Sequence, residues 1–344
     1  GYKATGFALY GDYAYYFRPK KDSQAWELVQ VDIQEQYSEV LTEFGADGSK
    51  MEQWVIKGII DCYYYGGKVW LHMSLDYQTA EDNWWNSQGN QLAAIDLSTG
   101  EFYEITEIYE ENGSYWYMSY GNFDAAYVGY EILTVQPEIM SAEAFAESVG
   151  VDVASLSEEE YWEYVFQNKV EENVVLDLRV IDLQTMESVS VFKDKGEKCL
   201  AESIYWTDEK YAYVAEQLSD DNIERYRIIS IDLRDGSKEE VLRFENGGAL
   251  GWYMGEASLN RYNGEDLLYL EYEGEDKCNI YKYSVSQGTS EWLFEDVAEV
   301  SFRIVGQTKD RLVGKLNEGT QYAWIYKADY EKGNLDAVKK FWLF

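Results

Sequence analysis

Chemistry in this chain would have to come mainly from carboxylates, because its 344 residues hold 64 Asp and Glu but a single histidine, His72. Asp61, Glu202 and Glu256 stand out, since each falls in a segment that we predict to be the first strand of a repeated unit. Carboxylates held together can act as acid and base or bind a cation. The alternative is a row of hydrated acids without a catalytic role. We favour that alternative, because 64 acids make accidental neighbours inevitable.

Histidine, cysteine and phosphate-binding chemistry finds little support. His72 lies in the strand-like run Val69–Met73, and no G-x-S-x-G motif accompanies it. Cys62, Cys199 and Cys278 are widely spaced, which predicts buried free thiols, with one disulfide plus a free thiol as the alternative. The sequence has no phosphate loop, no H-E-x-x-H and no calcium loop, so we expect neither a cofactor nor a metal.

Binding chemistry has a clearer candidate in the polar segment around Trp84, Trp85 and Asn86. Two adjacent tryptophans cannot both follow the in-and-out alternation of a strand, so we expect them in a loop. Aromatic rings flanked by amides can stack on sugars or anchor a protein partner, whereas the alternative is a lid over the neighbouring sheets. Lys20 and Lys21 form a basic island on an acidic chain, either a solvated turn or an anion site.

The elements that position these residues belong to a repeat. Each unit has four apolar runs separated by turns, and the third run ends at a recognisable anchor triplet. The anchors are Val31-Asp32-Ile33, Ile95-Asp96-Leu97, Ile181-Asp182-Leu183, Ile231-Asp232-Leu233, Tyr283-Ser284-Val285 and Ala328-Asp329-Tyr330. In the clearest copy, Asp235-Gly236-Ser237 forms a hairpin turn after the third run.

Six units of about 50 residues, each with four short strands, are typical of a β-propeller. The sequence therefore predicts an all-β, six-bladed propeller with four antiparallel strands per blade, formed by one domain. The blades are expected at about 1–48, 49–110, 111–195, 196–246, 247–297 and 298–344.

The third blade is longer because residues 134–172 form an insertion that we predict to be helical. Ser141 can cap a short helix over 142–148, and Ser157 with Glu160 fits a capping box for a second one. Trp162 lies on an apolar stripe of that second helix. The stripe either packs on the propeller or binds a partner.

One face of the propeller collects all the long connections. Antiparallel strands alternate in direction, so every connection between a second and a third strand lies at the same end. These connections are 18–24, 76–90 and 134–172, and long loops on a rigid scaffold are where binding usually resides. The predicted contact residues are Trp84, Trp85, Asn86, Lys20, Lys21 and Trp162.

The repeat carries two family resemblances. Tyr205-Trp206-Thr207-Asp208 resembles the tetrad of six-bladed propellers of the low-density-lipoprotein receptor type, and 231–237 is similar to a later segment of that family. The chain as a whole looks more like the Tyr-rich, acidic propeller-like domains of unknown function in exported and lipid-anchored proteins of Gram-positive bacteria, with TolB-like propellers next. That resemblance implies a cell-surface location and supplies no catalytic residues.

Composition limits the partners. The net charge is 29 − 64 = −35, which disfavours nucleic acid and anionic membrane surfaces. No apolar run is long enough for a transmembrane helix, and the start at Gly1 leads us to expect that a leader or anchor has been removed. We therefore predict a monomeric extracellular or cell-surface propeller that binds a protein or carbohydrate. A hydrolase or lyase with its carboxylates in the central channel and a structural ectodomain of a surface sensor are the alternatives.

Overall fold

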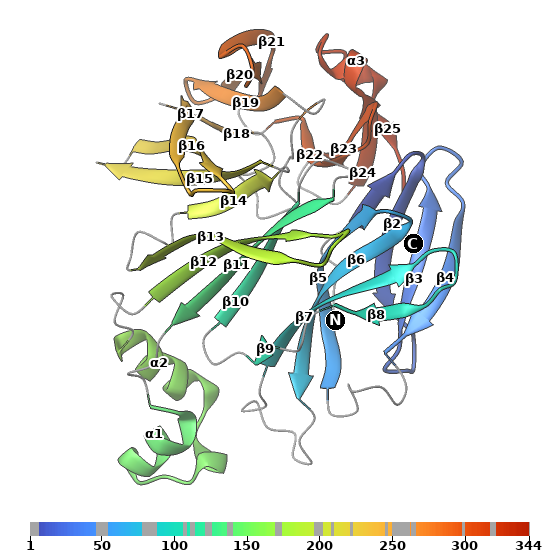
Figure 1. The fold of residues 1–344 in the computed structure, drawn as a ribbon. Helices are drawn as coiled ribbons and strands as arrows, with labels where there is room; N and C mark the ends of the chain where they lie inside the picture. The colour runs from blue at the N-terminus through green and yellow to red at the C-terminus, as the bar shows by residue number, and fades with distance from the viewer. Residues whose placement is uncertain are drawn as a thin grey trace.

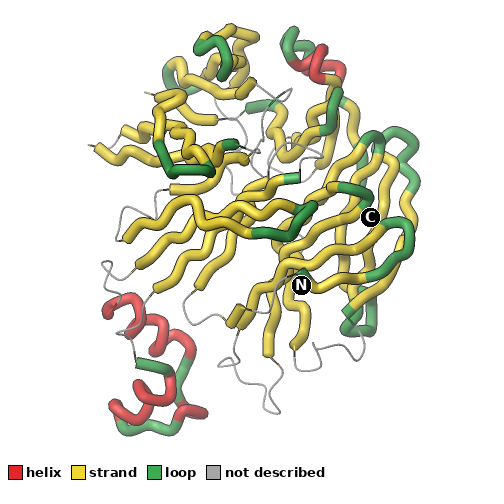
Figure 2. Tube along the Cα trace, viewed as in Figure 1, coloured by secondary structure: helices red, strands yellow, loops and turns green. Residues whose placement is uncertain are grey.

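The computed structural model describes most of the chain. The described residues are 7–45, 54–77, 88–105, 109–110, 114–120, 126–135, 140–168, 174–195, 202–207, 210–220, 223–244, 247–249, 262, 266–297, 300–316 and 321–343. Within these ranges the strands form six antiparallel sheets, each built from consecutive strands. Figures 1 and 2 show the sheets following one another round the molecule, with the first sheet beside the last. The all-β antiparallel prediction is confirmed.

The sheets are numbered here in chain order. The first sheet contains β1 (Phe7–Tyr10), β2 (Tyr13–Pro19), β3 (Trp26–Asp32) and β4 (Ser38–Phe44). The second contains β5 (Trp54–Tyr65), β6 (Lys68–Tyr77), β7 (Gln88–Asp96), β8 (Phe102–Glu104) and β9 (Tyr109–Glu110). The third contains β10 (Ser114–Tyr120), β11 (Tyr127–Val135), β12 (Val174–Asp182) and β13 (Ser188–Lys195). The fourth contains β14 (Glu202–Thr207), β15 (Tyr211–Asp220), β16 (Ile223–Asp232) and β17 (Lys238–Phe244). The fifth contains β18 (Gly247–Ala249), β19 (Asp266–Glu273), β20 (Lys277–Ser284) and β21 (Thr289–Val297). The sixth contains β22 (Phe302–Gln307), β23 (Arg311–Leu316), β24 (Gln321–Tyr326) and β25 (Lys339–Lys340).

A repeated hairpin explains why the anchor triplets recur. In the first four sheets the third strand ends at an aspartate whose Oδ1 accepts a hydrogen bond from the N–H two residues later. The aspartate carbonyl then accepts a second bond from the N–H four residues later, over 2.7 to 2.9 Å. That fourth residue has a positive φ, the backbone region that favours glycine. The four pairs are Asp32 and Gln36, Asp96 and Gly100, Asp182 and Met186, and Asp232 and Gly236.

The predicted sixth anchor is wrong, because β24 ends at Tyr326 and the chain continues into a short helix, α3 (Lys327–Tyr330). In the first sheet the residue after the anchor, Ile33, donates its N–H to the Asp12 carbonyl over 2.9 Å. Lys327 makes the equivalent bond to Asp310, also over 2.9 Å. Tyr326 therefore occupies the anchor position. It has no carboxylate to form the turn, and α3 and a 3-10 turn, η4 (Leu335–Ala337), follow instead.

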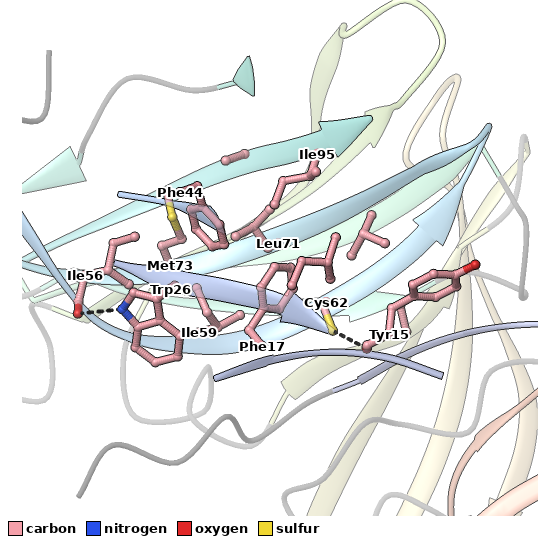
Figure 3. Close-up of a cluster of buried hydrophobic side chains, with 14 of the residues drawn as sticks. Tyr15, Phe17, Trp26, Phe44, Ile56, Ile59, Cys62, Leu71, Met73 and Ile95 are labelled. Atoms are coloured by element: carbon pink, nitrogen blue, oxygen red, sulfur yellow. Dashed lines mark hydrogen bonds between the residues drawn. The ribbon is translucent and has the colours of Figure 1, made fainter. Parts of the chain in front are cut away.

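The core lies between the sheets rather than inside any one of them. Between the first and second sheets, Phe17, Trp26 and Phe44 are buried against Ile56 and Leu71 (Figure 3). Similar shared clusters join the second sheet to the third, the fourth to the fifth, the fifth to the sixth and the sixth to the first. Strands β11 and β14 bring the third and fourth sheets into contact. Among the described residues, apolar burial thus holds the first, second, fifth and sixth sheets on both flanks.

The insertion of the third blade is helical, as predicted. It contains α1 (Ala142–Val149), a 3-10 turn, η1 (Val153–Ser155), and α2 (Glu158–Asn168). Ser141 caps α1, and Gly150 ends it in the left-handed conformation. Ser157 and Glu160 form the complete capping box at α2, because Glu160 N–H donates to Ser157 Oγ and Ser157 N–H donates to Glu160 Oε2. Figure 1 shows the two helices standing off the end of the third sheet.

Candidate functional site

The strand order assigns every connection to one of two ends. The connections between first and second strands and between third and fourth strands lie at one end, called here the turn end, and the others lie at the opposite loop end. The loop end carries the helical insertion between β11 and β12 and the connections after β2 and β6.

Two of the predicted loops are shorter than expected. Arg18 and Pro19 belong to β2, so the first connection is 20–25. Strand β6 extends to Tyr77 and β7 begins at Gln88, which leaves 78–87 rather than 76–90. Strands β2 and β6 are longer than the sequence pattern predicted, because their polar ends still pair with the next strand. Arg18 lies opposite Glu27, and Asp76 lies opposite Gln88.

The basic island of the first connection is partly neutralised. Lys20 Nζ donates to Glu43 Oε2 over 2.6 Å, and this carboxylate raises the pKa of Lys20. Arg18 Nε forms a similar pair with Glu27 Oε2 at 2.7 Å. Lys21 is exposed beside them. The pairs fix the base of the 20–25 connection, and an anion would have to compete with these carboxylates.

Several predicted residues lie outside the described part of the chain. Trp84, Trp85, Asn86 and Glu256 are among them, so their roles stay predictions. Glu202 begins β14, the first strand of the fourth sheet, but its side chain is not described. Of the three proposed channel acids, only Asp61 is described as a side chain.

Asp61 lies in β5, the first strand of the second sheet, as predicted. Its Oδ1 accepts a hydrogen bond from the Cys62 N–H over 3.0 Å, and its register partner on β6 is His72. The thiol of Cys62 is buried, which raises its pKa well above the usual range. A thiol held in its neutral form is a poor nucleophile. Of the neighbours Asp61 and Cys62, Asp61 is therefore the one that could act as an acid or a base.

His72 is structural in this setting. Its imidazole is 0% exposed, and Nε2 lies 2.9 Å from Asn90 Oδ1 on the neighbouring strand β7. Burial lowers the pKa of His72 to about 4, against a weaker opposing effect of the Asn90 hydrogen bond. A neutral, fully buried imidazole cannot reach a substrate proton. Among the described residues, no group of three or more His, Cys, Asp or Glu side chains could hold a metal ion.

The helical insertion exposes apolar groups at the loop end. Trp162 on α2 is 39% exposed and Met140, just before α1, is 47% exposed. Both are tied to the core of the insertion: Tyr161 lies against Trp162, and the Tyr164 hydroxyl accepts a hydrogen bond from the Met140 N–H over 3.0 Å. Phe145 stacks on Tyr164 at 4.2 Å, which locks α1 to α2. Within the described residues, no helix is long and apolar enough to cross a membrane.

The structure also brings together residues that the sequence pattern did not single out. At the turn end, Tyr10, Asp12 and Tyr13 surround the β1–β2 turn, and Arg311 from the sixth sheet pairs with Asp12. The Tyr-Gly-Asp-Tyr run is visible in the sequence, but it is typical of any tight hairpin turn. Arg311 is remote in sequence, so no spacing argument could have placed it there.

Comparisons with known proteins identify the fold only. No family model matches the chain, and no curated protein matches its sequence. An oligogalacturonate lyase solved in complex with manganese is 12% identical with a TM-score of 0.50, over 92% of this chain and 72% of that one. Pyrococcus horikoshii acylaminoacyl peptidase is 11% identical with a TM-score of 0.50, over 98% of this chain and 45% of that one. This chain thus spans less than half of the peptidase.

A further similar structure is the β-propeller domain of the Trilobed protease from Pyrococcus furiosus, with 12% identity and a TM-score of 0.39 over 78% of this chain and 69% of that one. Likeness at such low identity reports architecture and carries no activity. The ring of consecutive antiparallel sheets identifies the chain as a β-propeller fold.

Proposed function

We propose that this protein is a six-bladed β-propeller that acts as a binding module, recognising a protein or a glycan through its loop end without a catalytic step. The observation that carries the proposal is the helical insertion, which presents Trp162 with 39% of its surface exposed. An insertion that served only to cover the sheets would bury its largest apolar side chain. Exposed tryptophan on a well-supported element is a frequent anchor of binding surfaces.

The rigidity of the elements at the loop end supports the proposal. The insertion has capped helices and an aromatic core of its own, so Trp162 is displayed on a rigid element. Ion pairs hold the base of the 20–25 connection. Preorganised elements lose less conformational entropy on binding than free loops do.

The second candidate is a hydrolase or lyase with its site among the first strands. Its support is the likeness at fold level to an oligogalacturonate lyase and an acylaminoacyl peptidase. Asp61 would act as acid or base, with Glu202 and Glu256 as the other expected carboxylates. The Asp61→Asn variant separates the two candidates, because it removes this carboxylate and leaves the loop end unchanged.

The organisation and location of the protein follow as parts of the same proposal. One domain would comprise all six blades, with bounds near those expected from the repeat. The acidic composition and the resemblance to exported Gram-positive propellers support an extracellular or surface-anchored monomer.

Ligand selection tests the function directly. Ligands are selected on the full chain from a glycan array and from a phage-displayed peptide library. We expect Trp162→Ala to weaken the selected ligands at least ten-fold, and Trp292→Ala, an equally large exposed tryptophan on β21, to leave them unchanged. Equal affinity for wild type, Trp162→Ala and a chain whose residues 136–173 are replaced by a Gly-Ser linker would contradict the proposal. A screen without any ligand would favour the structural ectodomain instead.

A further inference from the structure

The helical insertion carries an apolar patch whose members are in direct contact. The Met140 N–H donates to the Tyr164 hydroxyl over 3.0 Å, and the Tyr161 hydroxyl donates to the Met140 carbonyl over 3.4 Å. The Trp162 ring lies beside the Tyr161 ring, with centroids 5.9 Å apart. Met140 and Trp162 are exposed, and both tyrosines are half-buried. Tyr161 thus connects Met140 to Trp162 in one continuous surface, called here the insertion patch.

Packing between the two helices holds the insertion patch in shape. Phe145 of α1 stacks on Tyr164 of α2 with ring planes 16° from parallel, and its centroid lies 6.3 Å from that of Tyr161. Figure 1 shows α1 and α2 projecting from the third sheet instead of lying on it. The patch is therefore presented on a preformed element, and a partner that binds it does not have to order it first.

Carboxylates border the insertion patch from both helices. Glu158 and Glu159 precede Trp162 by four and three residues, which places them beside it on the surface of α2. Burial, a neighbouring tyrosine and the charge of Glu143 raise the pKa of Tyr161, so Glu143 of α1 lies close to that ring. All three glutamates are exposed, and we call them the border glutamates.

No positive charge of the insertion offsets these acids. Residues 140–168 hold seven Asp and Glu and no Lys, Arg or His. Within the described ranges, no lysine or arginine forms an ion pair with a border glutamate. By contrast, Glu27 and Glu43 at the same end of the sheets each pair with a cation. The insertion patch therefore combines an apolar centre with an uncompensated negative border.

We propose that the insertion patch docks a cationic amphipathic segment of a partner protein. This inference rests on the proposed function, since it names the class of partner for the same loop-end surface. An apolar side chain of the segment covers Met140 and Tyr161, and its lysines or arginines face the border glutamates. One of these cations lies over the face of the Trp162 indole.

The charge of the border selects this class of partner. Nucleic acids, acidic glycans and anionic membranes are repelled by the carboxylates and by the net charge of −35. A neutral glycan stacks on Trp162 and gains nothing from the border glutamates. A cationic amphipathic segment uses both parts of the surface, because its apolar side chain is buried at the centre and its charges are attracted to the border.

Fluorescence anisotropy on the full chain tests the proposal. The probe is a fluorescein-labelled peptide of two Leu-Lys-Lys-Leu-Leu-Lys-Leu repeats, which forms a cationic amphipathic helix. The control peptide has Gln at every Leu position, so it keeps the charge and loses the apolar face. At low salt we expect a Kd of about 10 μM for the amphipathic peptide and binding about ten-fold weaker for the control peptide.

Substitutions in the insertion patch and on its border separate the two contributions. Trp162→Ala is expected to weaken the amphipathic peptide about ten-fold, whereas Trp292→Ala, at an exposed tryptophan of the fifth sheet, leaves it unchanged. The triple variant Glu143→Gln, Glu158→Gln and Glu159→Gln should also weaken it about ten-fold, and this effect should shrink as salt is added.

A charge-matched variant controls for the acidity of the whole chain. Glu35→Gln, Glu187→Gln and Glu239→Gln remove three exposed glutamates near the turns between third and fourth strands, at the opposite end of the sheets. The net charge changes by the same amount as in the border variant, and we expect binding to stay within about two-fold of wild type. Circular dichroism and thermal unfolding confirm that each variant is folded.

Several results would overturn the inference. They are no binding of the amphipathic peptide at about 100 μM protein, equal affinity for the two peptides, and equal weakening by the two triple variants. If a glycan or neutral peptide selected on the full chain depends on Trp162 and the amphipathic peptide does not, the proposed function stands and this inference fails. If no ligand of either kind depends on Trp162, both fail.

Discussion

At the scale of single residues, two strand glycines differ sharply in what surrounds them. A Cβ on Gly314 in β23 would collide with the Arg303 carbonyl and lie 2.8 Å from the Phe302 ring. A Cβ on Gly58 in β5 would meet nothing within 4 Å. Backbone atoms cannot move aside as the end of a side chain can, so position 314 does not accommodate a residue larger than glycine without a shift of the strands.

Gly314→Ala is expected to lower the free energy of unfolding by about 3 kcal/mol, because the added methyl group must push two strands apart. Gly58→Ala is the matched control and should change it by less than about 1 kcal/mol, since the new side chain only reduces backbone freedom in the unfolded chain. Urea unfolding measures both. Similar effects of the two substitutions would contradict the packing at Gly314.

His72 gives a second prediction at this scale. Its pKa of about 4 in the folded chain lies below the ordinary value of 6.5, so the unfolded chain binds more protons between these pH values. Stability is therefore fully present above pH 6.5 and falls as the pH drops towards 4. The expected loss is about 2 kcal/mol between pH 7 and pH 5.

The measurement is urea unfolding of wild type and of His72→Gln at both pH values. The carboxylates contribute equally to both proteins, so the difference between the two reports the imidazole alone. The extra loss of wild type over His72→Gln should vanish if the imidazole titrates near 6.5. NMR reads the same pKa directly, since His72 is the sole histidine.

At the scale of elements, the repeated hairpin places two non-glycine residues in the left-handed region. Met186 has φ 64° and Gln36 has φ 57°, where the equivalent turns use Gly100 and Gly236 at φ 71°. An L side chain is strained there, at a cost of about 1 kcal/mol or more. The hydrogen bond to the anchor aspartate holds these residues in place.

Met186→Gly should therefore stabilise the protein by about 0.5 kcal/mol, the relief of strain less the added freedom of the unfolded chain. Gly236→Ala is the reverse experiment, since a Cβ there meets nothing within 4 Å and only the positive φ opposes it. We expect it to cost about 1 kcal/mol. Denaturant midpoints measure both, and destabilisation by Met186→Gly would contradict the shared turn geometry.

At the scale of the whole molecule, the meeting of the first and last sheets depends on side chains. Trp324 Nε1 donates to the Ile33 carbonyl over 3.0 Å, and its ring is buried with Val313 and Phe341 beside Leu9. Two cations flank the indole: Arg311 lies 4.8 Å and Lys339 4.7 Å from the ring centroid. Consecutive sheets are joined by the chain, whereas this contact has only non-covalent support.

Trp324→Leu is expected to cost about 3 kcal/mol, from lost burial and an unpaired carbonyl. Hydrogen exchange should rise together in β1–β4 and β22–β25, because opening this contact exposes both sheets. Trp292→Leu, at an exposed tryptophan, is the control and should be near neutral. Faster exchange confined to the sixth sheet would show that the first sheet does not depend on this contact.

Local patterns in the sequence were enough to predict the strands, the hairpin turns and the helical insertion. Alternating apolar runs, Asp and Gly at turns, and the Ser157 capping box act over a few residues, so they can be read without knowing the partners. Strand ends were less predictable: Arg18 and Asp76 look like loop residues and extend their strands through pairing. The candidate site was predicted as a set of connections at one end with six named contact residues, of which the structure describes Lys20, Lys21 and Trp162.

The tertiary structure alone decided which distant residues meet. The pairs Arg311 with Asp12 and Trp324 with Ile33 are separated by 299 and 291 residues, and both exist only because the last sheet returns to the first. The stack of Tyr10 on Tyr64 depends in the same way on the packing of one sheet against the next. The sequence by itself determined that this chain forms repeated antiparallel units, because hydrogen bonds within hairpins are local. Which surfaces those units create was decided by burial between sheets, which depends on the closed arrangement of the whole chain.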